Sequence, residues 1–307
     1  MSIATPTART WRELRAAATD RLSDAALANA DQEARWIVEA VAGLRSAELV
    51  AEEREVAPES ARTRIDALIA RRLTGEPLQY VLGAWEFLGL DLFVDRRVLI
   101  PRPETEITAQ IAIDEAERRG GRRGRRAPWS GTVTDYLVVD LGTGSGAIAL
   151  ALATELSDAQ VWATDESADA LAVARANVAG NGAAGARVRL VHGDWFDALP
   201  AALRGRVRVI VSNPPYLRDD EVGDLPPEVA EHEPRAALVS GSTGLEAIEH
   251  IVGEARSWLE PGGALVLEID SRRAEPAMAL ATAAGLVDVR VAQDLTGRPR
   301  VLVARLP

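Results

Sequence analysis

Apolar side chains recur at helical spacing through the first part of the chain, as at Ile37, Val41 and Leu44. A period near 3.6 residues is typical of helices that bury one face. The turn signal Gly75-Glu76-Pro77 then closes the pattern. Residues 1–83 are therefore predicted to form a small N-terminal helical domain, and nothing in their pattern indicates chemistry.

The pattern changes between Ala84 and Ile100, where aromatic and aliphatic strand formers surround Gly89. Such a run predicts a β-hairpin. The segment Pro101-Arg102-Pro103 follows as a stiff extended linker. A helix is predicted from Glu104 to Arg119, because acids lie in its first turn and arginines in its last, which matches the helix dipole. Residues 84–103 are thus assigned to a hairpin linker between two domains.

From Tyr136 onward, short apolar runs alternate with helical patterns, which is typical of a doubly wound α/β domain. Strands are predicted at Tyr136–Asp140, Val161–Thr164, Val188–Val191, Val207–Ser212, Ala264–Ile269, Val287–Val291 and Val301–Ala304. Helices are predicted at Ser145–Leu156, Ala168–Ala179, Gly244–Leu259 and Arg273–Ala284. The short link before Val301 predicts an antiparallel edge hairpin, so the last of seven strands runs antiparallel.

Composition narrows the functional classes. With 307 residues, 47% hydrophobic content and a mean hydropathy of −0.03, the chain resembles a globular protein of two domains. The absence of cysteine excludes disulfides, thiolate nucleophiles and Cys-ligated zinc, and we expect no metal site. A net charge of −11 argues against stable binding to bare nucleic acid, which requires phosphate neutralisation. No apolar run reaches the ~18 residues of a membrane span, so no membrane partner is expected. We also expect the protein to be cytoplasmic and a monomer.

Two arginine-bearing segments have simple explanations. Trp11, Leu14 and Ala18 lie at helical spacing near the N-terminus, which favours a first surface helix over a transit peptide. The segment from Gly120 to Trp129 is rich in glycine and arginine. It is expected to be a solvated loop, with a polyanion-binding patch as the alternative.

A glycine-rich run, Asp140-Leu-Gly-Thr-Gly-Ser-Gly146, follows the first strand of this domain and opens a helix. Glycines let a backbone turn tightly and approach a ligand closely. Asp165 ends the second strand, where a ribose-binding acid belongs. Together these features indicate an adenosine nucleoside, and Gly142, Gly144 and Ala147 alone would also fit a dinucleotide fingerprint.

Two further strand ends favour S-adenosylmethionine over NAD. Asp194 and Trp195 follow the third strand and offer an acceptor and a ring beside an adenine amino group. The fourth strand stops at Asn213-Pro214-Pro215-Tyr216, where both prolines lack an N–H and the first restricts Asn213. This elbow offers acceptors and a stacking face without a nucleophile, so it suits holding a planar NH2 group.

The glycine run and the elbow together resemble class I methyltransferases that act on planar nitrogen. The wider set of motifs is similar to the peptide-chain release factor glutamine methyltransferases, the HemK/PrmC family. This resemblance rests on Gly75-Glu-Pro77, Phe93-Val94, Leu99-Ile-Pro-Arg-Pro-Glu-Thr-Glu106, Gly146-Ala-Ile-Ala-Leu150, Asp194-Trp-Phe196, Glu233-Pro234 and Gly241 to Gly244. It spans roughly residues 70 to 305. Asp270 departs from the family pattern, which usually has glycine there.

The resemblance implies a fold, a reaction and site residues. It implies a helical substrate-binding domain over residues 1–83 and a methyltransferase domain over residues 104–307. The implied reaction transfers a methyl group from S-adenosylmethionine, leaving S-adenosylhomocysteine, to N5 of the glutamine in the Gly-Gly-Gln motif of class I release factors. Cofactor contacts are implied for Gly142, Thr143, Gly144, Ser145, Gly146, Asp165, Asp194, Trp195 and Asn213. Substrate contacts are implied for Asn213, Pro214, Pro215 and Tyr216, and catalytic roles for Asn213, Pro214 and Tyr216.

In the expected mechanism, Asn213 Oδ1 and the Pro214 carbonyl accept the two amide hydrogens of the substrate, and Tyr216 packs against its amide plane. No general base is indicated, and Glu233 and Glu268 are candidates only for orienting roles. Alternative substrates are a glutamine of a ribosomal protein and an amino group of a DNA or RNA base. An NAD-dependent oxidoreductase and a non-catalytic binding module are less consistent with the elbow.

Overall fold

A computed structural model describes residues 9–120 and 136–307 of the protein. The chain divides into two compact units. The first comprises Met1–Gly83 with Pro227–His232, and the second comprises Ala84–Pro226 with Glu233–Pro307. The first eight residues and the arginine-rich segment after Gly120 were interpreted from sequence, and they lie outside the described residues.

The first unit is helical, as predicted. Its helices are α1 (Trp11–Asp24), α2 (Ala30–Ala42), α3 (Ser46–Glu52), α4 (Glu59–Arg72), α5 (Leu78–Leu82) and α10 (Pro227–His232). Thr10 caps α1 in a reciprocal pair with Glu13, which satisfies two backbone N–H groups at the helix start. Ile37 and Ile69 are among the apolar side chains of its core. Arg72 is buried and pairs with Glu33 at 2.7 Å, so the charge inside this unit is compensated.

The second unit contains a seven-stranded sheet in the order β10-β11-β9-β6-β3-β4-β5. Its strands are β3 (Tyr136–Leu141), β4 (Ala159–Asp165), β5 (Val188–His192), β6 (Val207–Ser212), β9 (Leu259–Glu268), β10 (Val287–Gln293) and β11 (Pro299–Arg305). The strand β11 is antiparallel to both neighbours, and the other adjacent pairs are parallel. The predicted antiparallel last strand is confirmed, but β11 is inserted between β9 and β10, so β10 forms the edge.

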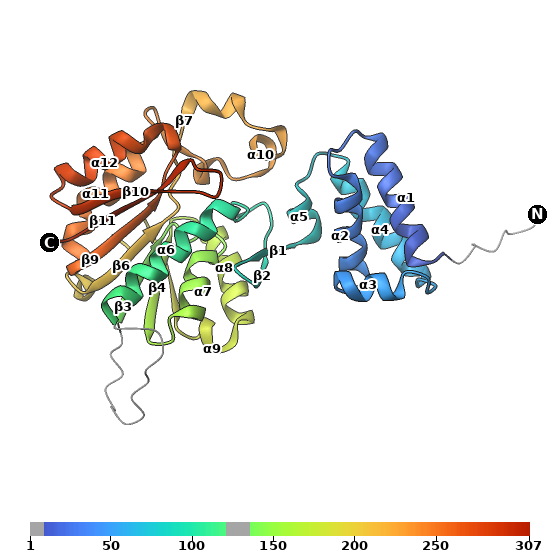
Figure 1. Ribbon diagram of the computed structural model, residues 1–307, viewed down its shortest axis with the longest axis horizontal. Coiled ribbons are helices and arrows are strands. Elements are labelled where there is room, and N and C mark those ends of the chain that lie inside the picture. Colours follow the sequence, from blue (N-terminus) through green and yellow to red (C-terminus); the bar gives the residue numbers. More distant parts are fainter. Residues whose placement is uncertain (1–8, 121–135) are drawn as a thin grey trace, which may run out of the picture. The chain divides into compact units, whose positions relative to one another are not determined.

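Helices cover both faces of the sheet (Figure 1). They are α6 (Pro103–Gly120), α7 (Ala147–Glu155), α8 (Ala168–Gly180), α9 (Gly182–Gly185), α11 (Glu246–Trp258) and α12 (Ala274–Ala283). Adjacent residues of β3 show the arrangement: Val138 belongs to the core under α6 and α7, and Val139 to the core under α11 and α12. Successive strand side chains point to opposite faces, so a strand buried on both sides is apolar throughout.

Shorter elements complete the second unit. The hairpin predicted after Ala84 is confirmed as β1 (Ala84–Phe87) paired antiparallel with β2 (Leu90–Phe93). The elements β7 (Leu217–Arg218), β8 (Val239–Gly241), η1 (Ala201–Leu203), η2 (Asp219–Asp224), η3 (Arg235–Ala237) and η4 (Ser271–Arg273) were not predicted. They are too short to show a hydrophobic period. Within the described residues, no helix has the length and apolar character needed to cross a membrane.

Candidate active site

A cavity of about 210 Å³ lies in the second unit, beside the glycine loop that follows β3. Loops that follow four parallel strands contribute to its wall, as expected at the carboxyl edge of an open α/β sheet. The residues predicted from sequence that line it are Gly142, Thr143, Gly144, Ser145, Asp165, Asp194, Trp195, Asn213 and Pro215. The sheet topology therefore brings most of the predicted residues to one place.

The glycine loop closely approaches an aromatic ring. Gly142 has a φ of +68°, and a Cβ placed on it would lie 3.4 Å from the ring of Trp195. Only glycine adopts this conformation without strain. Trp195 itself has a φ of +34°, which is uncommon for a bulky residue. The close fit between the loop and the indole defines one wall of the cavity.

Asp140 holds the glycine loop through hydrogen bonds. Its Oδ2 accepts hydrogen bonds from Thr143 Oγ1 at 2.6 Å and from the backbone N–H of Ala149 at 3.1 Å. It is fully buried, and burial raises the pKa of Asp140 to about 7. Asp140 does not line the cavity, so its contribution is to hold the loop against the start of α7.

Asp165 connects the end of β4 to the same loop. Its Oδ2 accepts from the backbone N–H of Gly144 at 2.8 Å, and its Oδ1 accepts from Ser167 N–H at 2.9 Å. Burial raises the pKa of Asp165, while these two N–H groups oppose the shift. A carboxylate oxygen accepts more than one hydrogen bond, so Asp165 retains acceptor capacity at the cavity wall.

The elbow after β6 places Asn213 at the wall of the same cavity. Asn213 Nδ2 donates to Thr105 Oγ1 at 3.1 Å, and Thr105 Oγ1 donates to Glu268 Oε2 at 2.8 Å. Thr105 lies in the first turn of α6 and also lines the cavity. Sequence reasoning did not single out Thr105, although it lies within the Leu99–Glu106 motif.

Three predicted site residues do not line the cavity: Gly146, Pro214 and Tyr216. A Cβ on Gly146 would lie 3.4 Å from that of Ala174, so this glycine allows α7 to approach α8. Within the elbow, Pro214 is buried and Tyr216 is half-buried. Burial raises the pKa of Tyr216, which keeps its hydroxyl protonated. The roles of these residues remain predictions.

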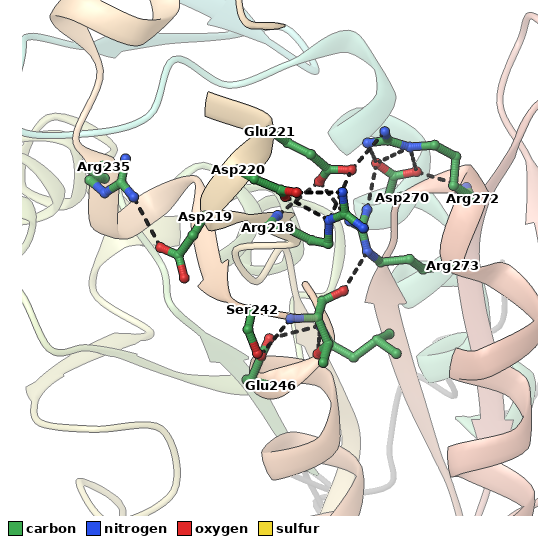
Figure 2. A network of polar contacts seen from close by, with 12 residues as sticks. Arg218, Asp219, Asp220, Glu221, Arg235, Ser242, Glu246, Asp270, Arg272 and Arg273 are labelled. Atoms are coloured by element: carbon green, nitrogen blue, oxygen red, sulfur yellow. Dashed lines mark hydrogen bonds and ion pairs between the residues drawn. The ribbon is translucent and has the colours of Figure 1, made fainter. Parts of the chain in front are cut away.

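Figure 2 shows a polar network around Arg273. Arg273 is buried, donates to Glu221 Oε2 at 2.6 Å and to the Thr243 carbonyl at 3.0 Å, and lies 3.1 Å from Asp270. Gly244, next to Thr243, has a φ of +74°, and a Cβ there would lie 2.7 Å from the carbonyl oxygen of Tyr216. The network therefore packs a glycine directly against the elbow backbone.

Asp270 has a structural role in this network. Its φ is −69°, a conformation open to any residue, so the position does not require the family's glycine. Its Oδ1 accepts from the backbone N–H of Arg272 at 2.8 Å and caps η4. The side chain also pairs with Arg272 and Arg273. The departure from the family pattern is thus accommodated by an aspartate cap and two ion pairs.

The acidic groups near the cavity do not form a metal site. In the part of the chain that the structure describes, no cluster of three or more His, Asp or Glu side chains is arranged to hold a metal ion. Among the same residues, Glu233 is paired with Arg102 at 2.5 Å. His192 Nε2 lies 2.9 Å from the carbonyl oxygen of Glu166. Among the described residues, these polar side chains therefore act as hydrogen-bonding and ion-pairing groups.

Two protein-family models match parts of the chain. The PrmC N-terminal domain family matches residues 13–83, and the methyltransferase small domain family matches residues 132–228. A release factor glutamine methyltransferase of Bordetella pertussis is 42% identical over 273 residues, covering 88% of this chain and 92% of that protein. One of Deinococcus radiodurans is 40% identical over 296 residues, covering 96% and 98%.

One solved structure shows the same fold at lower identity. The hMettl16 catalytic domain, crystallised with the MAT2A 3'UTR hairpin 6, is similar with a TM-score of 0.52. It is 15% identical and covers 82% of this chain and 84% of its own. This likeness concerns the methyltransferase fold alone.

Proposed function

Because the chain belongs to the release factor glutamine methyltransferases, we propose that it methylates a release factor. The reaction transfers a methyl group from S-adenosylmethionine to N5 of the glutamine in the Gly-Gly-Gln motif of class I release factors. The observation that carries this proposal is the position of Asn213, which lines the cavity while its Nδ2 is engaged by Thr105. That contact leaves Oδ1 as the acceptor for a substrate NH2 group.

The cavity residues fit S-adenosylmethionine. Gly142 leaves the room that a Cβ would fill against Trp195, so a ligand can lie close to the loop backbone. Asp165 would accept from the ribose hydroxyls, and Asp194 and Trp195 would contact the adenine. Thr143 to Ser145 would contact the methionine portion. When bound, S-adenosylmethionine supplies a methyl group activated by its positively charged sulfur.

The protein contributes alignment and charge stabilisation. An amide nitrogen is a weak nucleophile, because its lone pair is delocalised into the carbonyl. Asn213 Oδ1 and the Pro214 carbonyl would accept the two N–H groups of the substrate and fix the direction of its nitrogen. Both acceptors carry partial negative charge, so they favour positive charge that develops on that nitrogen. Tyr216 would restrict the amide plane from the side.

We also propose the setting in which the protein acts. The partner is a class I release factor as protein substrate, which places the protein in the cytoplasm. A net charge of −11 is consistent with a protein substrate and gives no support for stable nucleic-acid binding. We propose a monomer, which sedimentation of the purified protein would test.

Replacing Gly142 by alanine is expected to weaken S-adenosylmethionine binding about 10-fold. An alanine relaxes out of the left-handed conformation and away from the Trp195 ring in the free protein, and restoring the loop on binding costs roughly 1–2 kcal/mol. Isothermal titration calorimetry measures the change. Gly253→Ala is the matched control, because a Cβ at Gly253 meets nothing within 4 Å. Equal affinity for wild type and Gly142→Ala would contradict the assigned contact.

Labelled S-adenosylmethionine and a purified class I release factor test the proposed function. Peptide mapping by mass spectrometry should place one methyl group on the glutamine of the Gly-Gly-Gln motif. A release factor with glutamic acid at that position should remain unlabelled. Label found only on a ribosomal protein or on nucleic acid would replace the proposal with another methyltransferase activity.

A further inference from the structure

The hydrogen-bond donors available on Asn213, Thr105 and Glu268 fix the orientation of the Asn213 amide. An ionised carboxylate accepts hydrogen bonds and donates none, and a hydroxyl has a single hydrogen. Because Thr105 Oγ1 gives its hydrogen to Glu268, it can only accept from Asn213. Asn213 must therefore present Nδ2 to Thr105, and Oδ1 is left for another donor.

The hydrogen bonds that link Glu268, Thr105 and Asn213 can control the orientation of the elbow side chain. Thr105 comes from α6 and Glu268 from the end of β9, and both are buried, with 4% and 1% of their surface exposed. Buried polar groups adapt little, since each lost contact leaves an unsatisfied group. Asn213 is partly exposed at the cavity wall, so the buried pair imposes its orientation on the reactive end.

We propose that Thr105 and Glu268 are positioning residues, which hold Asn213 with its oxygen facing the substrate amide. This inference rests on the proposed function, because it assigns Asn213 Oδ1 to the glutamine NH2 group. Neither residue needs to touch the substrate. If Glu268 gains a proton, it can donate to Thr105, whose hydrogen is then released toward Asn213. The Asn213 amide can then turn over and present Nδ2 to the NH2 group of the substrate glutamine. Two hydrogen-bond donors would then face each other.

The electrostatic surroundings of Glu268 put this change in an accessible pH range. Burial raises the pKa of Glu268 to about 7, and Thr105 opposes the shift by its hydrogen bond. The charged groups acting on it are Arg300 of β11, which lowers the pKa, and Glu104 of α6, which raises it. Tyr216 of the elbow stays protonated. Glu268 is therefore charged above pH 7, and turnover should fall as the pH decreases through that value.

Valine and serine at position 105 separate hydrogen bonding from packing. Thr105→Val keeps the shape and removes the hydroxyl, so kcat at pH 8 should fall about 10-fold with little change in the KM for the release factor. Thr105→Ser keeps the hydroxyl and should restore kcat to within about 2-fold. Glu268→Gln still accepts from Thr105 but does not titrate, so the decrease in turnover near pH 7 should disappear.

Thr108→Val is the matched control. Thr108 lies on the same helix and is equally buried, and its Oγ1 is 3.4 Å from the same Glu268 oxygen. It has no contact with Asn213 among the described hydrogen bonds, but its hydrogen bond lowers the pKa of Glu268. The fall in turnover should therefore begin at a higher pH in Thr108→Val, while the plateau kcat above that pH equals that of wild type. Equal losses in Thr105→Val and Thr108→Val would show general loosening of the core and overturn the inference.

Nuclear magnetic resonance of the Asn213 side-chain amide provides a readout that needs no substrate. In protein with ¹⁵N-labelled asparagine, the Asn213 NH2 signals should shift with a midpoint near pH 7. The shift should be absent in Thr105→Val and Glu268→Gln. If the enzyme is active and the pH-dependent shift of its Asn213 signals is the same with and without these substitutions, the inference is overturned. The protein could instead leave release factors unmethylated while its Asn213 signals still depend on Thr105 and Glu268. That result would support the positioning role of the two residues and reject the proposed function.

Discussion

Replacing Asn213 by alanine is expected to lower turnover by about 10²–10³-fold while S-adenosylmethionine still binds. Removing one pre-positioned polar group from a reaction centre typically costs this much. The contacts proposed for the cofactor with the glycine loop, Asp165 and Trp195 do not involve this side chain, so the affinity for S-adenosylmethionine should change only a few-fold. Single-turnover methyl transfer to a release factor measures the rate, and calorimetry measures the affinity.

A second asparagine provides the control for this substitution. Asn181 lies at the end of α8, where its Nδ2 donates to the Asn177 carbonyl at 2.8 Å, and it does not line the cavity. Asn181→Ala should methylate at the wild-type rate. If Asn213→Ala also turned over like wild type, the elbow would not orient the substrate amide.

Replacing Arg273 by methionine is expected to lower the free energy of unfolding of the second unit by about 3 kcal/mol. The substitution removes one of the charge partners of Glu221 and of Asp270, and the donor to the Thr243 carbonyl. Breaking a buried ion pair typically costs 3–5 kcal/mol. We place the expected cost at the lower limit, because Arg272 still pairs with both carboxylates. Urea titration followed by circular dichroism measures the loss.

The matched control is Arg272→Met. Arg272 pairs with the same two carboxylates, but 61% of its side chain is exposed, compared with 8% for Arg273. Exposed ion pairs contribute little, so this change should cost less than about 1 kcal/mol. Similar losses for both variants would show that burial does not distinguish the two arginines.

The pH dependence of this network follows from its carboxylates. Burial would raise the pKa of Glu221, but hydrogen bonds from Arg218 N–H and Arg273 lower it overall. For Asp270, burial is likewise outweighed by Arg272, and the pKa is lowered. A carboxyl group with a lowered folded-state pKa stabilises the fold above its unfolded pKa, and this contribution is lost as the pH falls. The difference between wild type and Arg273→Met should therefore shrink below about pH 4.

Features set by neighbouring residues were predictable from the sequence. The run from Asp140 to Gly146 combines glycines with a strand before it and a helix after it, and each of these signals is local. The elbow is also local, since two prolines end β6 whatever surrounds them. Parallel strands then bring these ends together at one edge, so the cavity could be located before any coordinates were known.

Contacts between distant segments could not be predicted in this way. Thr105 and Asn213 are separated by 108 positions and meet only because α6 packs on the sheet. The sequence makes Glu268 a candidate for an orienting role, but its link to Asn213 through Thr105 depends on where β9 ends beside α6. The short helix α10 gave no periodic signal, and its grouping with the first unit reflects tertiary contacts.

A crystal structure with S-adenosylhomocysteine and a peptide containing Gly-Gly-Gln tests the central claim most directly. The account predicts that the glutamine amide nitrogen lies within hydrogen-bond distance of both Asn213 Oδ1 and the Pro214 carbonyl oxygen. Asn213 Nδ2 should remain on Thr105. A glutamine bound with its carbonyl oxygen toward Asn213, or outside the cavity beside Gly142, would contradict the account.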